Sequence, residues 1–235
     1  MKKRIVILSG AGISAESGIA TFRDSNGLWE NYAIEDVATP KAWLQNPELV
    51  TQFYNLRRKQ VIESLPNDAH RYFADLEQAF EVIIITQNID DLHERAGSSH
   101  VIHLHGNIRQ SKSSGPMQER EYFPIDGWEL TAEDRCPHGY RLRPHVVWFG
   151  EAVPNLELAA DLVGTADYLV VVGTSLNVYP AAGLIHNTKN TCIKWVIDPK
   201  ADALDVDHTF QKISTSAVEG VSRLRFAPLE MTSNS

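Results

Sequence analysis

Six short runs of apolar, largely β-branched residues recur along this chain, and helix-length stretches separate them. The runs are almost continuously apolar, which is typical of strands covered on both faces. Buried strands that alternate with helices predict an α/β fold, a parallel sheet with helices on both faces. The predicted strands are Arg4–Leu8, Val82–Thr86, Val101–Leu104, Val146–Phe149, Tyr168–Val172 and Lys194–Ile197. The predicted helices are Pro47–Leu65, Asp68–Gln78, Leu156–Leu162, Ala181–Asn187 and Ser216–Leu224.

Two segments interrupt this alternation. Residues 25–65 are mostly helical in pattern and rich in aromatic residues, whereas residues 107–143 are polar and lack a strong periodicity. We expect these two inserts to form a smaller lobe within a single domain that spans residues 1–235. The larger lobe is then built from about residues 1–24, 66–106 and 144–230. A chain of 235 residues can bury such a core without disulfides.

Charge and cysteine content exclude some classes of function. The net charge of −8 argues against binding to nucleic acid or to a membrane surface, because both need a basic face. Cys136 and Cys192 form no disulfide framework, which favours a reducing compartment. The apolar run Ile5–Leu8 is too short for a signal peptide. We therefore expect a cytoplasmic protein.

A glycine-rich turn follows the first predicted strand directly. Its residues, from Gly10 through Gly12 to Ala15, match the pattern G-x-G-x-x-A, which lets backbone N–H groups approach a pyrophosphate. A dehydrogenase would also have a second strand ending in an acidic residue about twenty positions later. Here the sequence TFRD and the aromatic insert stand at that place, which makes hydride transfer a distant alternative.

Polar or small residues follow three further predicted strands. The carboxyl ends of parallel strands meet at one edge of a sheet, where open α/β folds bind ligands. These groups are Gln87, Asn88 and Asp90, then Gly173, Thr174 and Ser175, and finally Asp198. Together with the glycine turn they predict a dinucleotide crevice. Asp90 or Asp91 could instead cap the next helix while Asn88 faces the ligand.

Two histidines flank Leu104 near the end of the third predicted strand. His103 and His105 share a face if the strand continues, although the chain could already turn at His105. Histidine is the usual general base near neutral pH, but a pair of this kind also occurs in a purely structural role.

Five segments, in order, resemble the sirtuins, a family of NAD-dependent protein deacylases. They are GAGISAESGIATFRD, TQNIDDLHERAG, the LHG that contains His105, RPHVVWFGE and GTSLNVYPA. The resemblance extends from Ile5 to about Leu224. It implies a Rossmann-like larger domain, a smaller lobe made of the two inserts, and NAD in the cleft between them.

The resemblance also assigns roles to matching residues. The implied NAD-binding residues are Gly10, Ala11, Gly12, Ser17 and Gly18 at the phosphate turn, Phe22, Arg23 and Asp24 in a loop over the nicotinamide ribose, Gln87, Asn88, Ile89, Asp90 and His105 in the ribose and nicotinamide pocket, and Gly173, Thr174, Ser175, Asp198 and Ala217 on the adenosine side. Many relatives have Asn where this chain has Asp198, so the ribose contact there stays open.

The implied reaction transfers an acyl group from lysine to ADP-ribose. The acyl oxygen attacks the ribose C1′ as nicotinamide leaves, giving an alkylimidate, and His105 then activates a ribose hydroxyl while Asn88 and Asp90 organise C1′. The implied partners are acyl-lysine proteins or peptides, which would add a strand to the substrate-binding segment. That segment comprises Val147, Trp148, Phe149, Gly150 and Glu151.

The insert at 25–65 resembles the sirtuin subgroup that removes succinyl and malonyl groups. Tyr54 and Arg57 match the tyrosine and arginine of that subgroup, and positions three apart share a helix face. A guanidinium suits a carboxylate because its planar fork makes two parallel hydrogen bonds. The alternative is an ordinary amphipathic helix with Phe53, Leu56 and Val61 inward and Arg57, Arg58 and Lys59 in solvent.

Sirtuins usually hold a structural zinc between two cysteine pairs in the smaller lobe. The first pair should fall near Ser113 and Pro116, and the second near Cys136 and Gly139. One thiolate, even beside His138, cannot fill a tetrahedral site, so we expect no zinc. Packing should then hold this lobe, through Tyr122, Phe123, Trp128 and Leu130.

Other functions remain open at this point. A protein ADP-ribosyltransferase would use the same NAD cleft, and a non-catalytic NAD-sensing module would need no base such as His105. A deacylase for lipoyl or long-chain acyl groups is a further alternative.

Overall fold

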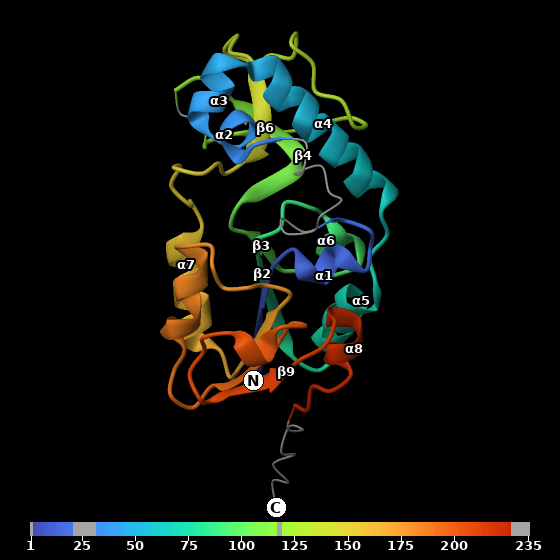
Figure 1. Cartoon of the computed structure of the whole chain (residues 1–235), viewed down its shortest axis with the longest axis vertical. Coiled ribbons are helices and arrows are strands. Elements are labelled where there is room, and N and C mark those ends of the chain that lie inside the picture. Colours follow the sequence, from blue (N-terminus) through green and yellow to red (C-terminus); the bar gives the residue numbers. More distant parts are fainter. Residues whose placement is uncertain (1, 21–31, 117–118, 227–235) are drawn as a thin grey trace, which may run out of the picture.

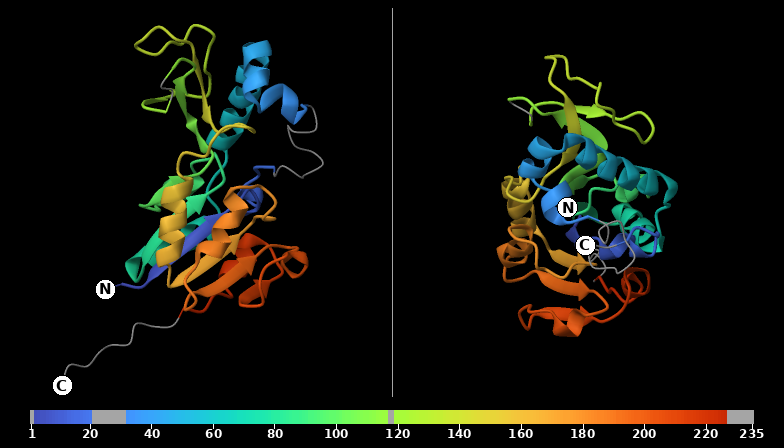
Figure 2. Two further views of the ribbon diagram at one scale, coloured as in Figure 1. Left: turned by 90° about the vertical axis from the view of Figure 1, so that its left-hand side faces the viewer. Right: turned by 45° about the horizontal axis from the view of Figure 1, so that its top comes forward.

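The computed structural model describes residues 2–20, 32–116 and 119–226, which form two lobes (Figure 1). A six-stranded parallel sheet with helices on both faces makes the larger lobe. A three-stranded antiparallel sheet and a group of helices make the smaller lobe, which stands at one end of the larger (Figure 2). The predicted α/β class is confirmed.

All strands of the larger sheet run parallel, and the order in which the chain adds them reverses at the centre of the sheet. Its strands are β1 (Arg4–Ser9), β2 (Glu81–Thr86), β3 (Val101–His103), β7 (Tyr168–Val172), β8 (Ile193–Ile197) and β9 (Phe210–Ile213). They lie in the order β3-β2-β1-β7-β8-β9, so β1 pairs with β2 on one side and with β7 on the other. This is the doubly wound order, in which a crevice opens beyond the strand ends where the order reverses.

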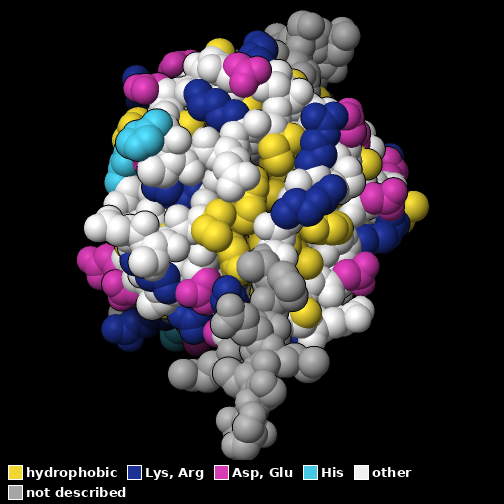
Figure 3. All heavy atoms as spheres, turned by 90° about the horizontal axis from the view of Figure 1, so that it is seen from below, with side chains coloured by type: hydrophobic (Ala, Val, Ile, Leu, Met, Phe, Trp, Pro, Cys, Tyr) yellow, Lys and Arg dark blue, Asp and Glu magenta, His cyan; other side chains and the backbone are white. Residues whose placement is uncertain are grey.

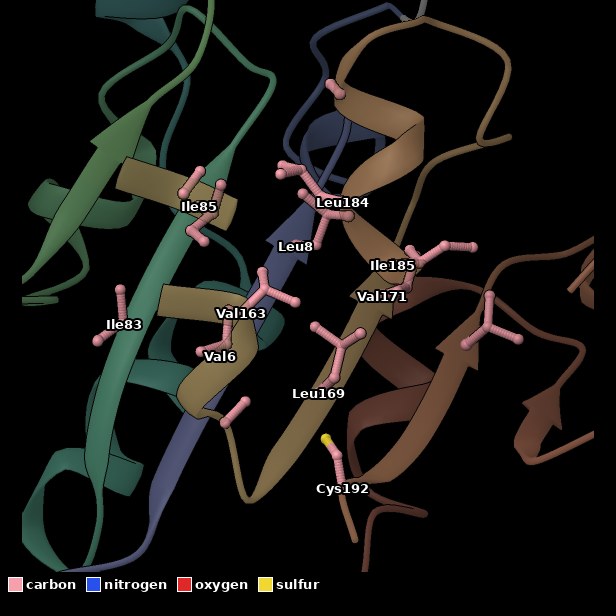
Figure 4. Close-up of a cluster of buried hydrophobic side chains, with 14 of the residues drawn as sticks. Val6, Leu8, Ile83, Ile85, Val163, Leu169, Val171, Leu184, Ile185 and Cys192 are labelled. Carbon is pink, nitrogen blue, oxygen red and sulfur yellow. The ribbon is translucent and has the colours of Figure 1, made fainter. Parts of the chain in front are cut away.

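The sheet is apolar on both faces, as the continuous apolar runs predict. Val6 and Leu8 point into a cluster under α7 (Leu156–Thr165) and the 3-10 helix η3 (Ala181–Asn187) (Figure 4). Their neighbours along β1 point to the other face, under α5 (Asp68–Asp75) and α8 (Ala217–Val221). Burying one such side chain contributes about 1.5–3 kcal/mol, so both clusters stabilise this lobe.

The smaller lobe combines helices from one insert with strands from the other. The helices are α2 (Ile34–Val37), α3 (Pro40–Gln45) and α4 (Pro47–Glu63), and the strands are β4 (Gly106–Ser113), β5 (Tyr122–Pro124) and β6 (Leu142–Val146). Two of the helices begin with a proline that follows a capping residue. Thr39 Oγ1 accepts a hydrogen bond from Ala42 N, and Asn46 Oδ1 accepts one from Leu49 N. These side chains satisfy backbone donors that the first turn leaves unpaired.

A buried polar clamp fastens the second insert to α4. The Arg58 side chain is fully buried, and its Nε donates to the carbonyl oxygen of Ile108 at 2.6 Å. Its Nη1 donates to Asn55 Oδ1 at 2.7 Å and to the carbonyl oxygen of Trp128 at 2.8 Å. Asn55 in turn exchanges two hydrogen bonds with the backbone of Leu130, at 2.9 and 3.0 Å. We call Arg58 and Asn55 the α4 clamp.

The clamp corrects the prediction that packing alone holds this insert. Leu130 and Phe123 do join an apolar cluster, and the cluster also contains Cys136. Tyr122 and Trp128, however, are each 39% exposed. The alternative of a plain amphipathic α4 is wrong as well, because Arg58 is buried rather than solvated. Leu56, expected inward, is 37% exposed.

The predicted strand Val146–Phe149 is wrong except at its first residue. The observed strand is β6, which ends at Val146. Beyond it the chain turns at Phe149 and Gly150, and the φ of Gly150 is +92°. Three strands were not predicted: β4, β5 and β9. The residues of β4 look like a polar loop, yet Ser111 and Lys112 are buried. Ala181–Asn187 is a 3-10 helix, and Asp68–Gln78 is α-helical only to Asp75 before the 3-10 turn η2 (Leu76–Gln78).

The end of the molecule away from the smaller lobe carries both signs of charge (Figure 3). Lys and Arg side chains are interspersed with Asp and Glu around a band of hydrophobic side chains. A nucleic-acid-binding face would concentrate lysine and arginine instead. Within the described residues, no helix combines the length and apolar character that a membrane span requires.

Candidate active site

The glycines of the first turn bring two strand ends into direct contact. Gly10 N donates to the carbonyl oxygen of Val172 at 3.0 Å, and Gly12 N donates to that of Gly173 at 2.8 Å. A Cβ atom on Gly12 would lie 2.7 Å from Gly173 Cα. Gly173 has φ +61°, and a Cβ there would lie 2.3 Å from Ile13 N. Glycine is therefore required here for the approach of β1 to β7, a packing role that the motif alone does not reveal.

A buried polar cluster lies beyond β2, next to this turn. Ser14, on the short helix α1 (Gly12–Ala15), is fully buried, and its Oγ donates to Asp90 Oδ2 at 3.0 Å. Asn88 Nδ2 donates to the same Oγ at 3.2 Å. Burial raises the pKa of Asp90, and hydrogen bonds from Leu92 N and Ser14 oppose this rise. The Leu92 bond, at 3.2 Å, shows that Asp90 satisfies the backbone donor at the first residue of α6 (Leu92–Arg95), whereas Asp91, at the N-cap position, makes no side-chain cap hydrogen bond.

Two buried histidines lie next to this cluster, and neither was predicted from the sequence as a site residue. His70 Nε2 lies 3.5 Å from Ser14 Oγ, and His93 Nε2 lies 3.0 Å from the hydroxyl of Ser9. The two imidazole rings meet edge to face, with centroids 4.9 Å apart. Burial lowers the pKa of His70 to about 4 and the pKa of His93 well below its ordinary value, so both are neutral at pH 7. No periodic signal marks them, because each lies in the first turns of a helix.

The structure separates the two histidines near β3. The strand ends at His103, and the chain turns before Gly106, where φ is +86°. His105 Nδ1 lies 2.9 Å from the carbonyl oxygen of Gln87, so Nδ1 carries the proton and Nε2 carries the lone pair. Burial lowers the pKa of His105, with the Gln87 carbonyl opposing it. His105 is thus suited to act as a neutral base.

Further predicted NAD contacts lie at the same edge of the sheet. Gln87 Nε2 donates to Thr174 Oγ1 at 3.2 Å and joins the ends of β2 and β7. Asp198 follows β8, and its Oδ1 accepts from Lys200 N at 2.8 Å. Ala217 is the first residue of α8, which follows β9, and is buried.

The phosphate turn is tied to the smaller lobe and its linker. Asn67 Nδ2 donates to Ser17 Oγ at 3.0 Å, and Gln60 Nε2 donates to the carbonyl oxygen of Gly18 at 3.0 Å. Gly18 has φ +84°. Phe22, Arg23 and Asp24, also predicted to contact NAD, lie outside the described residues.

Two of the predicted substrate residues, Tyr54 and Arg57, lie next to each other on α4. Tyr54 is 1% exposed, and the guanidinium carbon of Arg57 lies 5.9 Å from the centroid of its ring. Burial raises the pKa of Tyr54 to about 12, with the charge of Arg57 opposing it. Burial lowers the pKa of Arg57, and the charges of Tyr54 and Asp90 oppose that shift. Arg57 therefore lies within electrostatic reach of Asp90.

The predicted substrate segment links His105 to both lobes. Val147 N donates to the carbonyl oxygen of His105 at 2.9 Å, and Phe149 N donates to that of Ala38 at 3.0 Å. Glu151 Oε2 accepts from Trp148 N at 2.8 Å. The other oxygen of this carboxylate accepts from Arg143 Nη2 at 2.7 Å, and the Arg143 guanidinium lies 3.7 Å above the Trp148 ring.

The place expected for a zinc ion has one thiol. Cys136 Sγ lies 3.5 Å from Ser113 Oγ, so the two chain segments that should supply paired ligands do meet. A hydroxyl and a single thiol do not make the four-ligand set that structural zinc needs. Across residues 2–20, 32–116 and 119–226, no group of three or more His, Cys, Asp or Glu side chains could hold a metal ion.

Comparison with known proteins gives consistent results across sequence and structure. A family model described as the Sir2 family matches residues 10–180. An NAD-dependent protein deacylase of Bacteroides thetaiotaomicron is 48% identical over 227 residues, covering 95% of this chain and 97% of that protein. An NAD-dependent protein deacylase of Helicobacter pylori is 48% identical over 233 residues, covering 98% of this chain and 100% of that protein.

Solved structures of similar proteins contain the corresponding ligands. A complex of a Sir2 homologue with NAD superposes with a TM-score of 0.82 at 39% identity, covering 94% of this chain and 88% of the other. A mutant Sir2 protein with a deacetylated p53 peptide and 3′-O-acetyl-ADP-ribose superposes with a TM-score of 0.77 at 31% identity. That match covers 94% of this chain and 92% of the other.

Proposed function

The chain belongs to the Sir2 family, and from this premise we propose which acyl groups it removes as an NAD-dependent protein deacylase. The proposed substrates are succinyl- and malonyl-lysine, with acetyl-lysine also accepted. The observation that carries the proposal is the partly buried Arg57 guanidinium beside Tyr54, close enough to Asp90 for that carboxylate to oppose the lowering of the Arg57 pKa by burial.

The carboxyl edge of the sheet fits NAD. Polar side chains from β1, β2 and β7 converge where the strand order reverses, the position at which doubly wound sheets bind dinucleotides. Gly10, Ala11, Gly12, Ser17 and Gly18 would hold the phosphates, Gln87, Asn88, Ile89, Asp90 and His105 would border the nicotinamide and its ribose, and Gly173, Thr174, Ser175, Asp198 and Ala217 would border the adenosine. Phe22, Arg23 and Asp24 are proposed on the resemblance alone. When bound, NAD supplies an electrophilic ribose carbon and a nicotinamide leaving group.

The side chains of this chain would orient the reactants and move one proton. The Asn88 amide and the Asp90 carboxylate, each held by Ser14, would fix the ribose in a site from which water is largely excluded. The lone pair of His105 Nε2 would accept a proton from a ribose hydroxyl. These three side chains are the proposed catalytic residues.

A carboxylate on the acyl chain would compensate the desolvation of Arg57. A guanidinium that loses water gains most from a charged, bidentate partner. The aromatic rings of Phe53 and Tyr54, 5.7 and 5.9 Å from the guanidinium carbon, would line the methylene part of a succinyl chain. A neutral acetyl group offers Arg57 no such partner.

The proposed partners are acyl-lysine proteins or peptides. The turn at Val147, Trp148, Phe149, Gly150 and Glu151 would pair with an extended peptide through main-chain hydrogen bonds, which tolerate many sequences. The two free thiols, Cys136 and Cys192, support a reducing compartment, and we place the protein in the cytoplasm.

Substitution of Arg57 tests the acyl preference. For Arg57→Met, we expect kcat/KM for a succinyl-lysine peptide to fall about 10- to 100-fold, the value of a hydrogen-bonded charge. The value for the acetyl peptide should stay within about threefold. Arg71→Met, at an exposed position of α5, is the matched control and should change neither. An equal loss on both peptides would exclude a carboxylate-reading role, as would a strong preference of the native enzyme for long-chain or lipoyl peptides.

Mass spectrometry of the products separates deacylation from ADP-ribosyl transfer. With NAD and a succinyl peptide, we expect free lysine, nicotinamide and succinyl-ADP-ribose. A peptide that gains ADP-ribose would assign the cleft to transferase chemistry instead.

A further inference from the structure

His103 bridges the catalytic loop and helix α6. Its Nδ1 lies 3.0 Å from the carbonyl oxygen of Asn88, and its Nε2 lies 2.7 Å from Glu94 Oε1. The carbonyl oxygen of His103 accepts a hydrogen bond from Asn155 Nδ2 at 2.9 Å, which fixes the backbone that carries the ring. The His103 side chain is 12% exposed.

These two contacts determine the proton content of the ring. A carbonyl oxygen and a carboxylate both accept hydrogen bonds, whereas a neutral imidazole has only one N–H to donate. Both bonds can form only if each ring nitrogen carries a proton, so His103 is an imidazolium. Asn107 Nδ2, at 3.5 Å from Nε2, is a weaker competitor, and bonding to it would leave the carboxylate facing a lone pair.

The surrounding charges agree with a cation at this position. Glu94 on α6 and Asp90 on the loop after β2 are the anions that face the ring, and His93 on α6 and His145 on β6 are the other titratable groups around it. Burial alone would lower the pKa of His103, but Glu94, the Asn88 carbonyl and Asp90 together raise it above its ordinary value. Burial raises the pKa of Glu94, and the bond and charge of His103 outweigh that effect.

We propose that the protonated His103–Glu94 pair is a positioning element that holds Asn88 in its catalytic orientation. The ring does not touch the reacting atoms. It anchors the Asn88 carbonyl, while the amide of the same residue donates to Ser14. When the imidazolium loses a proton, the remaining N–H stays at Nε2 with the Glu94 carboxylate, the stronger acceptor. Nδ1 then turns a lone pair toward the Asn88 carbonyl, and the loop that carries Asn88 and Asp90 loses an anchor. The inference rests on the proposed role of Asn88.

The pair gives the pH profile of kcat/KM a second limb. The acid limb belongs to His105, which must be neutral to act as a base, and it lies below pH 6.5 because burial lowers the pKa of His105. The alkaline limb belongs to His103 and lies above pH 6.5. The enzyme is most active between them, with one histidine neutral and its neighbour charged.

Glu94→Gln is the test, because it removes the charge and keeps the size of the side chain. With an acetyl-lysine peptide and NAD, we expect the alkaline limb to move down by about one pH unit, with the acid limb unchanged and the maximum within about threefold. Glu157→Gln, at an exposed position of α7, removes a negative charge elsewhere and should leave both limbs of the pH profile in place. The acetyl peptide keeps this test independent of the proposed preference for acidic acyl groups.

Histidine NMR measures the pair without any activity. In protein with labelled histidines, the His103 signals, assigned by comparison with His103→Asn, should titrate above pH 6.5, and at least one unit lower in Glu94→Gln. A native His103 that titrates at or below 6.5 would overturn the inference. A shifted NMR titration with an unmoved alkaline limb would overturn the positioning role while leaving the deacylase intact.

Discussion

The charge of each site histidine follows from the atoms that its ring nitrogens face. His105 has a carbonyl oxygen at Nδ1 and is suited to be neutral, whereas His103 has acceptors at both nitrogens and is charged. His70 and His93 lie among hydroxyl and amide groups and are neutral through burial. Four histidines within one site thus take different proton states through local hydrogen bonding.

His105→Tyr should separate catalysis from cofactor binding. A tyrosine at this position keeps an aromatic ring but lacks a base of suitable pKa, so we expect kcat to fall at least about 100-fold. The dissociation constant for NAD, measured by calorimetry, should change much less. Deacylation at the native rate would show that another group takes the proton.

Sequence reasoning identified the residues of this site that stand in recognisable segments. Asn88, Asp90 and His105 follow strands and lie in matching motifs, so their convergence could be predicted. The hydrogen bonds among Ser14, Asn88 and Asp90 could not, because a hydroxyl's partners depend on side-chain placement after folding. For the same reason, the residue pattern alone left His103 and His105 as equivalent candidates, and only the resemblance to sirtuins selected His105.

Helix α4 serves two neighbours through two of its faces. Tyr54 and Arg57 pack against each other, with Arg57 within electrostatic reach of Asp90, and the α4 clamp of Asn55 and Arg58 holds the second insert. In each pair the two residues are three positions apart, so they share one face of the helix. The second pair is displaced by one position from the first and therefore lies on a neighbouring face. Any shift of the clamped insert would therefore move the helix that carries Arg57.

Arg58→Met should destabilise the protein through the clamp. The change leaves the buried carbonyl groups of Ile108 and Trp128 without a donor, and we expect the free energy of unfolding to fall by about 3 kcal/mol. Urea denaturation measures this, with Arg71→Met as the control.

A zinc-free smaller lobe is a separate prediction. Addition of EDTA should not change the midpoint of urea denaturation of the native protein, and metal analysis should find no zinc. About one tightly bound zinc per chain would show that a metal holds the lobe.

The elements of the larger lobe were easier to predict than those of the smaller. Continuous apolar runs such as Val82–Thr86 leave few alternatives to a buried strand. Strand β4 is polar, and its buried Lys112 is paired with Glu119, so hydrophobic patterning could not identify it. The strand predicted at Val146–Phe149 lies too late in the sequence, because the strand that pairs with β6 and defines its register could not be known from the sequence.

At the scale of the molecule, the strand order does most to assemble the site. Gly10, Gln87 and Thr174 meet only because β1 lies between β2 and β7, with all three strands parallel. The smaller lobe then stands over this edge and brings α4 to it (Figure 2). The alternation of strands and helices predicts a parallel sheet, and the two segments that interrupt it predict the second lobe, which the resemblance to sirtuins also implies.

The histidines also make the stability of the whole molecule depend on pH. His70 and His145, with pKa values lowered by burial to about 4, and His93 stay neutral in the folded protein. The unfolded chain takes up these protons near pH 6.5, so stability is present above that pH and is lost as the pH falls toward 4. His103 acts in the opposite sense, because its raised pKa contributes stability below pH 6.5 that is lost as the pH rises through the folded value.

We therefore expect the free energy of unfolding to fall between pH 6.5 and 5, where most carboxylates are still ionised. Each histidine kept neutral contributes a slope of up to about 1.4 kcal/mol per pH unit. His145→Gln removes one contribution outside the NAD site. It should reduce the slope by about 1 kcal/mol per pH unit, since the ring is only partly buried and water screens its charge. Urea titrations of both proteins at pH 7.5, 6.5 and 5.5 measure the difference. Equal slopes would show that folding does not lower the pKa of His145, and the stacking of its ring on Tyr122 would then have to accommodate a cation at pH 5.5.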